Sequence, residues 1–193
     1  MPEIHIGDRV VGDGYPTYVI AEIGVNHNGI VQLAFDLIDA AVEAGVDAVK
    51  FQKRNLDELY PDKYLEDANV GEKNLNYLLP ILKRVELSNE DYYRIVEYCE
   101  ERDVTFLCSV FDRESADFID QLGVPAFKVA SADMINLPLL DHLIEKGKPL
   151  IVSTGMSRME EVETTVDFLK SKEVEFALLH CNSTYPAAFE ADA

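Results

Sequence analysis

Residues 18–52, YVIAEIGVNHNGIVQLAFDLIDAAVEAGVDAVKFQ, contain one complete strand–helix–strand unit. The two ends of this stretch, Tyr18–Gly24 and Ala48–Gln52, are short apolar runs without polar alternation, which is typical of parallel strands covered on both faces. Between them, apolar residues recur at helical spacing, and Gly45 ends the pattern. The predicted apolar stripe of this helix consists of Leu33, Leu37, Ala41 and Ala44.

The same pattern recurs along the chain. Further apolar runs predict strands at Thr105–Phe111, Ala126–Ser131, Pro149–Gly155 and Phe176–Asn182, with amphipathic stretches between them. Six βα units in series predict a parallel α/β fold, which is either a doubly wound sheet or a (β/α)8 TIM-type barrel. The pattern by itself does not separate these two architectures.

Two segments stand apart from this repeat. Residues 1–17 predict a short hairpin with turn residues at Gly12-Asp13-Gly14, and residues 18–193 predict one domain of this parallel α/β type. The connection from Lys53 to Ser88 is long and charged, and it contains one predicted helix, Leu78–Arg84. A connection of this size is either a functional lid or a surface insertion.

Composition narrows the classes of function. The chain has 193 residues, 48% of them hydrophobic, and a formal net charge of -19. This charge argues against nucleic acid or an anionic membrane surface as a partner, because both require a positive field. No apolar run approaches the roughly 20 residues of a spanning helix, and the first residues lack a signal-peptide pattern, so we expect a cytoplasmic protein. The cysteines, Cys99, Cys108 and Cys181, are odd in number and widely spaced, so we expect buried thiols rather than disulfides.

Polar side chains end most of the predicted strands, where α/β proteins place their active sites. Lys50 and Lys128 are the most informative, because a lysine inside an apolar strand requires an anionic partner. That partner is either an internal carboxylate, Glu22 or Asp133, or a bound phosphate or carboxylate. Serines at the strand ends and N–H groups after Gly155 favour the second alternative, because they bind phosphate oxygens without adding charge. The cluster therefore predicts a site for a phosphorylated small molecule.

For the other candidates, a functional and a structural interpretation are weighed against each other. Glu22 is a general base, a general acid or a hydroxyl-binding group, or else it pairs with Lys50. His27 is either a turn histidine satisfied by local backbone or a substrate contact. His180 is expected to be a buried, hydrogen-bonded core residue rather than a ligand. No pair of histidines has the spacing of metal ligands.

Five segments in order carry a resemblance to a known family: AEIGVNHNG, AGVDAVKFQ, FKVAS, STGMS and LLHCNSTYP. Together they resemble the N-terminal portion of the sialic acid (N-acetylneuraminate) synthase family, over residues 18–186. The resemblance implies a (β/α)8 barrel that joins C3 of phosphoenolpyruvate to the aldehyde carbon of an open-chain amino sugar such as N-acetylmannosamine. Water adds at C2 and phosphate leaves, which gives a nine-carbon 2-keto acid.

The resemblance also implies roles for individual residues. Glu22, Lys50 and Asp133 are implied as catalytic. Gln52 and Tyr185 match positions that meet the sugar or assist proton transfer. Contacts to phosphoenolpyruvate are implied for Lys50, Ser109, Lys128, Ser131, Ser153 and Ser183. Two of these positions depart from the family pattern: Ser183 stands where relatives often have asparagine, and Asp133 where many have glutamate. The shorter carboxylate of Asp133 shifts the expected reach toward a different sugar.

A divalent metal and a dimer are implied by the same resemblance. The metal, Mn²⁺ or Mg²⁺, is held by histidines of the last two barrel strands, and a small C-terminal domain reaches over the partner's active site in a homodimer. Such a barrel has eight strands in about 250 residues, whereas this sequence predicts six strands. We therefore expect an incomplete barrel whose metal ligands lie outside the chain. Two alternatives stay open, a legionaminic or pseudaminic acid synthase and a non-catalytic protein that retains phosphate and carboxylate binding.

Overall fold

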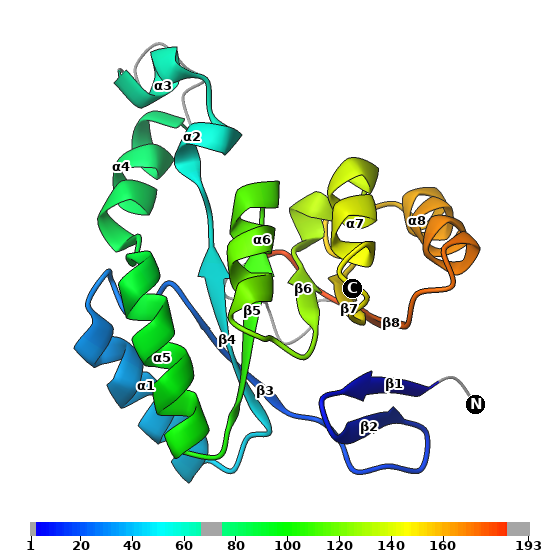
Figure 1. The fold of residues 1–193 in the computed structure, drawn as a ribbon. Coiled ribbons are helices and arrows are strands. Elements are labelled where there is room, and N and C mark those ends of the chain that lie inside the picture. The colour runs from blue at the N-terminus through cyan, green and yellow to red at the C-terminus, as the bar shows by residue number, and fades with distance from the viewer. Residues whose placement is uncertain (1–2, 67–74, 185–193) are drawn as a thin grey trace.

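A six-stranded parallel sheet forms the centre of the computed structural model, which describes residues 3–66 and 75–184. The strands pair in the order in which they occur in the chain (Figure 1). They are β3 (Ile20–Gly24), β4 (Ala48–Lys53), β5 (Thr105–Val110), β6 (Phe127–Val129), β7 (Leu150–Ser153) and β8 (Phe176–Leu179). A doubly wound sheet reverses its strand order at a switch point, whereas a barrel pairs each strand with the next. The sequential pairing order therefore confirms the barrel type. All six predicted strands are present in this sheet.

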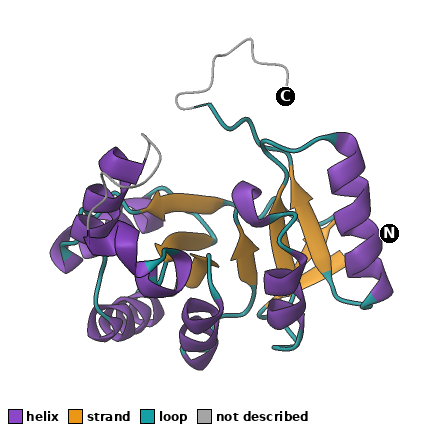
Figure 2. Ribbon diagram, turned by 90° about the horizontal axis from the view of Figure 1, so that it is seen from above, coloured by secondary structure: helices purple, strands orange, loops and turns teal. Residues whose placement is uncertain are grey.

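Helices cover the outer side of this sheet. Seen from above, the strands form an arc, and the helices lie along its convex side (Figure 2). They are α1 (Val31–Glu43), α5 (Asn89–Glu101), α6 (Arg113–Gln121), α7 (Leu137–Ile144) and α8 (Met159–Ser171). No helix within the described ranges is long and apolar enough to cross a membrane.

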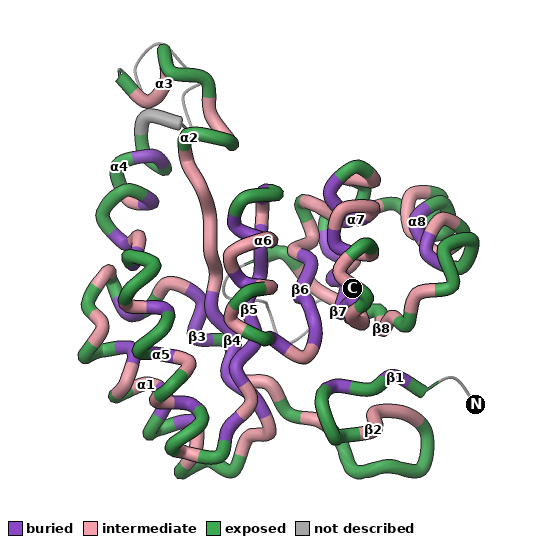
Figure 3. The backbone as a smooth tube through the Cα atoms, viewed as in Figure 1, coloured by how far each residue is buried: buried purple, intermediate pink, exposed green. Residues whose placement is uncertain are grey.

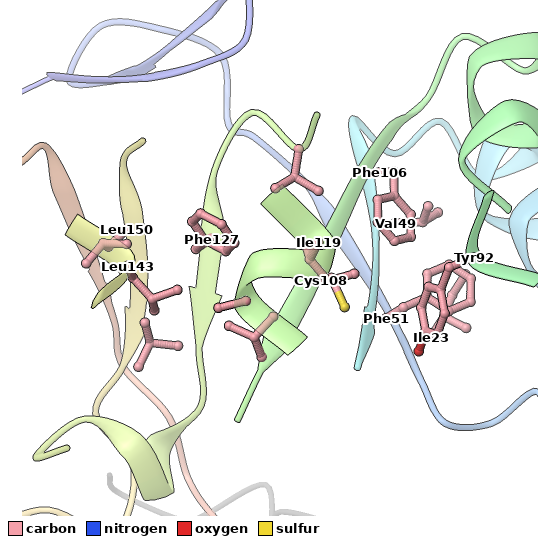
Figure 4. Close-up of a cluster of buried hydrophobic side chains, with 14 of the residues drawn as sticks. Ile23, Val49, Phe51, Tyr92, Phe106, Cys108, Ile119, Phe127, Leu143 and Leu150 are labelled. Carbon is pink, nitrogen blue, oxygen red and sulfur yellow. The ribbon is translucent and has the colours of Figure 1, made fainter. Parts of the chain in front are cut away.

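The outward side chains of the strands form the larger hydrophobic core with these helices. Phe51, Phe106 and Phe127 project from neighbouring strands into this layer, where Tyr92 and Ile119 meet them from the helices (Figure 4). The helix after β3 packs through a different stripe from the predicted one. Its buried residues are Ala34, Ile38 and Ala41, whereas Leu33 and Ala44 are exposed. This helix is apolar on more than one side, so periodicity could not decide which side faces the sheet.

The inward side chains form a second, smaller core at the amino ends of the strands. A hairpin of β1 (Glu3–Ile6) and β2 (Arg9–Gly12) places Ile4 and Ile6 against it, and both are buried (Figure 3). The strand residues of this layer are Ala48, Leu107 and Ile151, with Ala126 just before β6. The turn that joins the two hairpin strands lies at Gly7-Asp8, not at the predicted Gly12–Gly14, which forms a separate turn after β2. The hairpin thus closes the end of the arc opposite the carboxyl ends of the strands.

The long connection after β4 contains α2 (Leu56–Leu59), α3 (Asp62–Glu66) and α4 (Leu75–Val85), so the helix predicted at Leu78–Arg84 is confirmed. The connection is tied to the rest of the fold at both ends. Glu58 accepts hydrogen bonds from the N–H groups of Arg113 and Glu114 at the start of α6. At the other end, α4 lies against the loop after β3, where a Cβ on Gly29 would come 2.5 Å from the Arg84 carbonyl oxygen. Its role as a lid stays a prediction.

Candidate functional site

The inner face of the sheet changes character along the strands. Side chains two residues apart lie on the same face of a strand. On the inner face of four strands, an apolar side chain is followed two residues later, nearer the carboxyl end, by a polar one. The pairs are Ala48 and Lys50, Leu107 and Ser109, Ala126 and Lys128, and Ile151 and Ser153. All four polar members are buried. A polar layer of two lysines and two serines therefore lies above the apolar layer that the hairpin seals.

Lys50 has an internal counterion. Its Nζ lies 2.7 Å from Oε2 of Glu22, which occupies the neighbouring position on β3, and 3.4 Å from the hydroxyl of Ser109. The Lys50 side chain is 3% exposed, whereas that of Glu22 is 60% exposed. For this lysine the predicted internal ion pair is present, and its carboxylate end is open to an incoming molecule.

Lys128 has no such counterion. Its Nζ donates to the Ser153 hydroxyl at 2.6 Å and to the Val129 carbonyl at 3.0 Å. Across residues 3–66 and 75–184, no carboxylate lies within ion-pair distance of this ammonium group. Burial lowers the pKa of Lys128 to about 8, and the charge of Lys50 acts in the same direction. A buried cation held only by neutral oxygens is suited to pair with an anion.

Two further serines converge at Gly155, two residues after Ser153. The Ser131 hydroxyl, in the short 3₁₀ helix η2 (Ser131–Asp133), accepts a hydrogen bond from the N–H of Gly155 at 3.1 Å. A Cβ on Gly155 would lie 2.8 Å from this oxygen and would overlap the hydroxyl of Ser183. Only glycine allows both hydroxyls to approach the chain here. Together with Ser153, which bonds Lys128, these hydroxyls offer neutral hydrogen-bond donors of the kind that suits a phosphate.

The residues assigned to the sugar lie farther toward the strand ends. The Gln52 carboxamide oxygen accepts a hydrogen bond from Nη2 of Arg54 at 2.8 Å. Burial raises the pKa of Asp133, while a 3.4 Å hydrogen bond from Asn136 and the nearby charge of Arg54 oppose this shift. No ion pair joins Asp133 to either lysine in the described part of the chain, so the alternative of Asp133 as a lysine partner is not supported. Tyr185 lies outside the described residues.

One buried histidine lies in the loop after β3. The Nδ1 of His27 accepts a hydrogen bond from the Gly29 N–H at 3.1 Å, and its ring stacks on Phe51 with the centroids 5.9 Å apart. Its Nε2 is buried without a geometrically acceptable partner among the described residues, although the Gly24 carbonyl is near enough to act on the ring. The local-backbone interpretation of His27 is therefore supported. His180 is exposed, so the prediction of a buried core residue is wrong: it follows β8, which lies at the edge of the described sheet.

No metal cluster is formed by the residues described. Within residues 3–66 and 75–184, no three His, Cys, Asp or Glu side chains are grouped so that they could hold an ion. The residues present therefore do not form a metal site by themselves. The cysteines are free thiols, and burial raises the pKa of Cys99 and Cys108 to about 12, which makes both unreactive. Cys181 is only half-buried.

Arg54 is the site residue that sequence reasoning missed. It was assigned to the long connection, but it continues the inward positions of Lys50 and Gln52 by one further step of two residues. Its guanidinium carbon lies 3.7 Å from the ring centroid of Phe111, which follows β5. Strand side chains alternate between the two faces of a sheet, and following this alternation past the last apolar position would have indicated Arg54.

A cavity borders the serine side of the cluster. Its volume is about 470 Å³, and it reaches the site through Thr154 and Ser183. The apolar part of its lining is formed by Met156, which precedes α8, and by Met159 and Val162 in the first turns of α8. The lysines themselves lie on the inner face of the arc rather than in this cavity.

Known proteins match both the sequence and the fold. The profile of the NeuB family matches residues 37–192. An N,N'-diacetyllegionaminic acid synthase of Legionella pneumophila is 41% identical over 95% of this chain and 54% of its own length. The human N-acetylneuraminate-9-phosphate synthase is 35% identical over 92% of this chain and 50% of its own length.

A solved structure gives the same result. The crystal structure of the N-acetylneuraminic acid synthetase of Leptospira borgpetersenii, in complex with citrate, superposes with a TM-score of 0.84 at 32% identity. The superposition covers 97% of this chain and 61% of that one. The chain spans about half the length of the curated relatives it matches. Since the family profile, the relatives and the fold agree over most of its residues, the chain belongs to the NeuB family.

Proposed function

We propose that this chain contributes the phosphoenolpyruvate-binding half of a synthase that condenses phosphoenolpyruvate with an N-acetylated amino sugar. The observation that carries the proposal is Lys128, a buried cation whose hydrogen bonds in the structure go to a hydroxyl and a carbonyl. Membership of the NeuB family, whose relatives include named legionaminic and N-acetylneuraminate-9-phosphate synthases, supports this type of reaction.

In the proposed complex, the two lysines divide the charges of phosphoenolpyruvate. Lys128, with Ser153 and the two hydroxyls at Gly155, would hold the phosphate, and Lys50 would hold the carboxylate beside Glu22. Because these groups are fixed by strands, the three-carbon substrate would be held in one orientation against the sugar. The bimolecular step then becomes effectively unimolecular.

The proposed chemistry forms one bond and breaks another. C3 of phosphoenolpyruvate attacks the aldehyde carbon of the open-chain sugar, whose oxygen takes up a proton and becomes a hydroxyl. Water adds at C2, and the C2–O bond to phosphate breaks, so that inorganic phosphate and a nine-carbon 2-keto acid are released. Glu22 is proposed to exchange a proton in this sequence, because it is the carboxylate in contact with Lys50 and is open to the substrate side.

The acceptor is proposed only as a class. Asp133 and Gln52 lie toward the strand ends, beyond the lysines, where a sugar would follow the C3 carbon. The departure of Asp133 from the glutamate expected in sialic acid synthases keeps N-acetylmannosamine and the legionaminic and pseudaminic precursors as alternatives. A divalent metal, a homodimer and a cytoplasmic location are proposed from the family resemblance, and no step above is assigned to the metal.

The test is phosphate release. Expressed from its complete reading frame and assayed with Mn²⁺ or Mg²⁺, the protein is expected to release phosphate from phosphoenolpyruvate only when a suitable amino sugar is present. Lys128→Met should abolish the release, whereas Lys172→Met, at a surface lysine paired with Asp141, should not. Sugar-independent release, or no turnover with any N-acetylated hexosamine tried, would contradict the proposal. Calorimetric binding of phosphoenolpyruvate without turnover would favour the non-catalytic alternative.

A further inference from the structure

Arg54 contacts Gln52 and Phe111, although the proposed reaction assigns it no role. Its Nη2 donates to Oε1 of Gln52 at 2.8 Å, and its guanidinium lies over the ring of Phe111. The two contacts come from Gln52 in β4 and from Phe111 just after β5, so the guanidinium plane is held from two directions. A planar group fixed in this way loses little freedom on forming its hydrogen bond.

This contact decides which end of the Gln52 amide is free. Arginine has donors only, so the carboxamide atom facing it must be the oxygen. The Nε2 group is then directed to the other side, where it lies 3.5 Å from the position of a Cβ on Gly24, compared with 4.0 Å for the Cδ atom. Gly24 ends β3, the strand that carries Glu22. None of the described residues accepts a hydrogen bond from this Nε2 group.

We propose that Arg54 is a positioning residue for the acceptor sugar, which fixes the Gln52 side chain so that it presents N–H donors rather than its oxygen to the substrate. This inference rests on the proposed function and deepens it. The sugar group that meets Gln52 is then one that only accepts hydrogen bonds, such as an acyl carbonyl oxygen. Without Arg54, the amide is free to turn through 180°, and half of its orientations present an oxygen that repels such a group.

The electrostatics of the neighbourhood agree with this placement. The charge of Arg54 acts on Asp133, where it opposes the rise in pKa caused by burial, while Asp112 acts in the direction of burial. Arg54 is therefore near enough to act on the second carboxylate assigned to the acceptor end. Lys50 and Lys128, at the other end of the site, have their own partners and do not contact Gln52.

The first test observes the amide directly in the isotope-labelled chain. The side-chain NH₂ signals of Gln52, identified by their loss in Gln52→Ala, are expected at positions distinct from those of exposed glutamines. Arg54→Met should move them to the exposed positions, and Arg54→Lys, which keeps the charge but not the fork, should move them partway. Arg94→Met is the matched control, because Arg94 also lies over an aromatic ring, that of Phe35, and bonds a nearby side chain. Unchanged Gln52 signals in Arg54→Met would overturn the inference. Arg54→Gln replaces Arg54→Met if the latter does not fold.

The second test is a double-mutant cycle on turnover. Arg54→Met is expected to raise the KM of the sugar about tenfold and to leave the KM of phosphoenolpyruvate within about twofold. On a Gln52→Ala background the same substitution should have no further effect, because its target is gone. Additive effects, or a change in the phosphoenolpyruvate KM instead, would overturn the positioning role while the proposed function stands. If the unaltered protein turns over no sugar, the proposed function fails. The NH₂ signals of Gln52 then test by themselves whether Arg54 fixes the amide.

Discussion

The Lys50 ammonium lies 2.7 Å from the Glu22 carboxylate, yet the two side chains differ widely in exposure, at 3% and 60%. The pair therefore spans the boundary between the packed interior and the open face of the sheet. The Glu22 carboxylate remains accessible to a ligand or to solvent, whereas the Lys50 ammonium is held in place by the strands. Such a pair can exchange its internal counterion for a bound anion without moving the lysine.

Glu22→Gln is expected to separate binding from turnover. Removing the negative charge beside Lys50 should strengthen phosphoenolpyruvate binding by a few fold, because a half-exposed ion pair contributes about 1 kcal/mol. Turnover should fall steeply, because the proton-exchanging group is lost. Calorimetry measures the first effect and phosphate release the second. Weaker binding in Glu22→Gln would show instead that Glu22 helps to hold the substrate.

Binding of phosphoenolpyruvate is expected to weaken as the pH rises through about 8. Burial and the Lys50 charge lower the pKa of Lys128 to about 8, so this cation, which binds the anion only when protonated, is lost above that value. At about pH 9, binding should therefore take up a proton, because the bound phosphate raises the lysine pKa again. Calorimetry in buffers with different ionisation enthalpies measures the uptake. Lys128→Met should remove both effects, and pH-independent binding in the unaltered chain would contradict the assignment.

Gly155→Ala is expected to impair anion binding more than folding. Its new methyl group would overlap the Ser183 hydroxyl and crowd that of Ser131, and both hydroxyls can rotate away at a cost of about 1 kcal/mol in the free energy of unfolding. Once rotated, they no longer face the phosphate position. Urea unfolding and calorimetric binding distinguish the two effects.

A second substitution separates crowding from the loss of donors. Adding Ser183→Ala to Gly155→Ala should restore part of the stability, because the overlap with Ser183 is relieved while Ser131 stays crowded, but should not restore binding. Full recovery of affinity in the double variant would mean that the Ser183 hydroxyl does not contact the ligand.

His27→Phe is expected to cost about 1 kcal/mol of stability, because it keeps the stacking on Phe51 but leaves the Gly29 N–H without its acceptor. Burial lowers the pKa of His27 below its ordinary 6.5. As the pH falls, this histidine is therefore protonated in the unfolded chain before it is protonated in the folded chain. The contribution of neutral His27 is therefore complete above about pH 6.5 and is lost as the pH falls below that value. Urea unfolding across this range should show a steeper acid loss in the unaltered chain than in His27→Phe. Parallel pH curves would contradict a buried neutral His27.

The six strands were predictable because each is a short apolar run between turn residues, a local property of the chain. The same holds for Lys50 and Lys128 as unusual residues, since a lysine within an apolar strand is visible without a structure. The buried stripe of α1 was not predictable, because Leu33 and Ala34 are both apolar and only the sheet decides which of them it covers. The exposure of His180 likewise depends on which strands lie beside β8.

The sequence by itself determined the βα repeat, the polar residues that end the strands and the family resemblance, because each depends on residue order alone. Only the tertiary structure decided the sequential pairing of the strands, since both parallel architectures share the same pattern. It also decided that Lys50 is paired with Glu22 while Lys128 bonds only neutral oxygens of the described residues, because register places Glu22 beside Lys50 but Ser109 and Ile151 beside Lys128. Arg54 entered the site for the same reason: its contact with Phe111 crosses from one strand to the next.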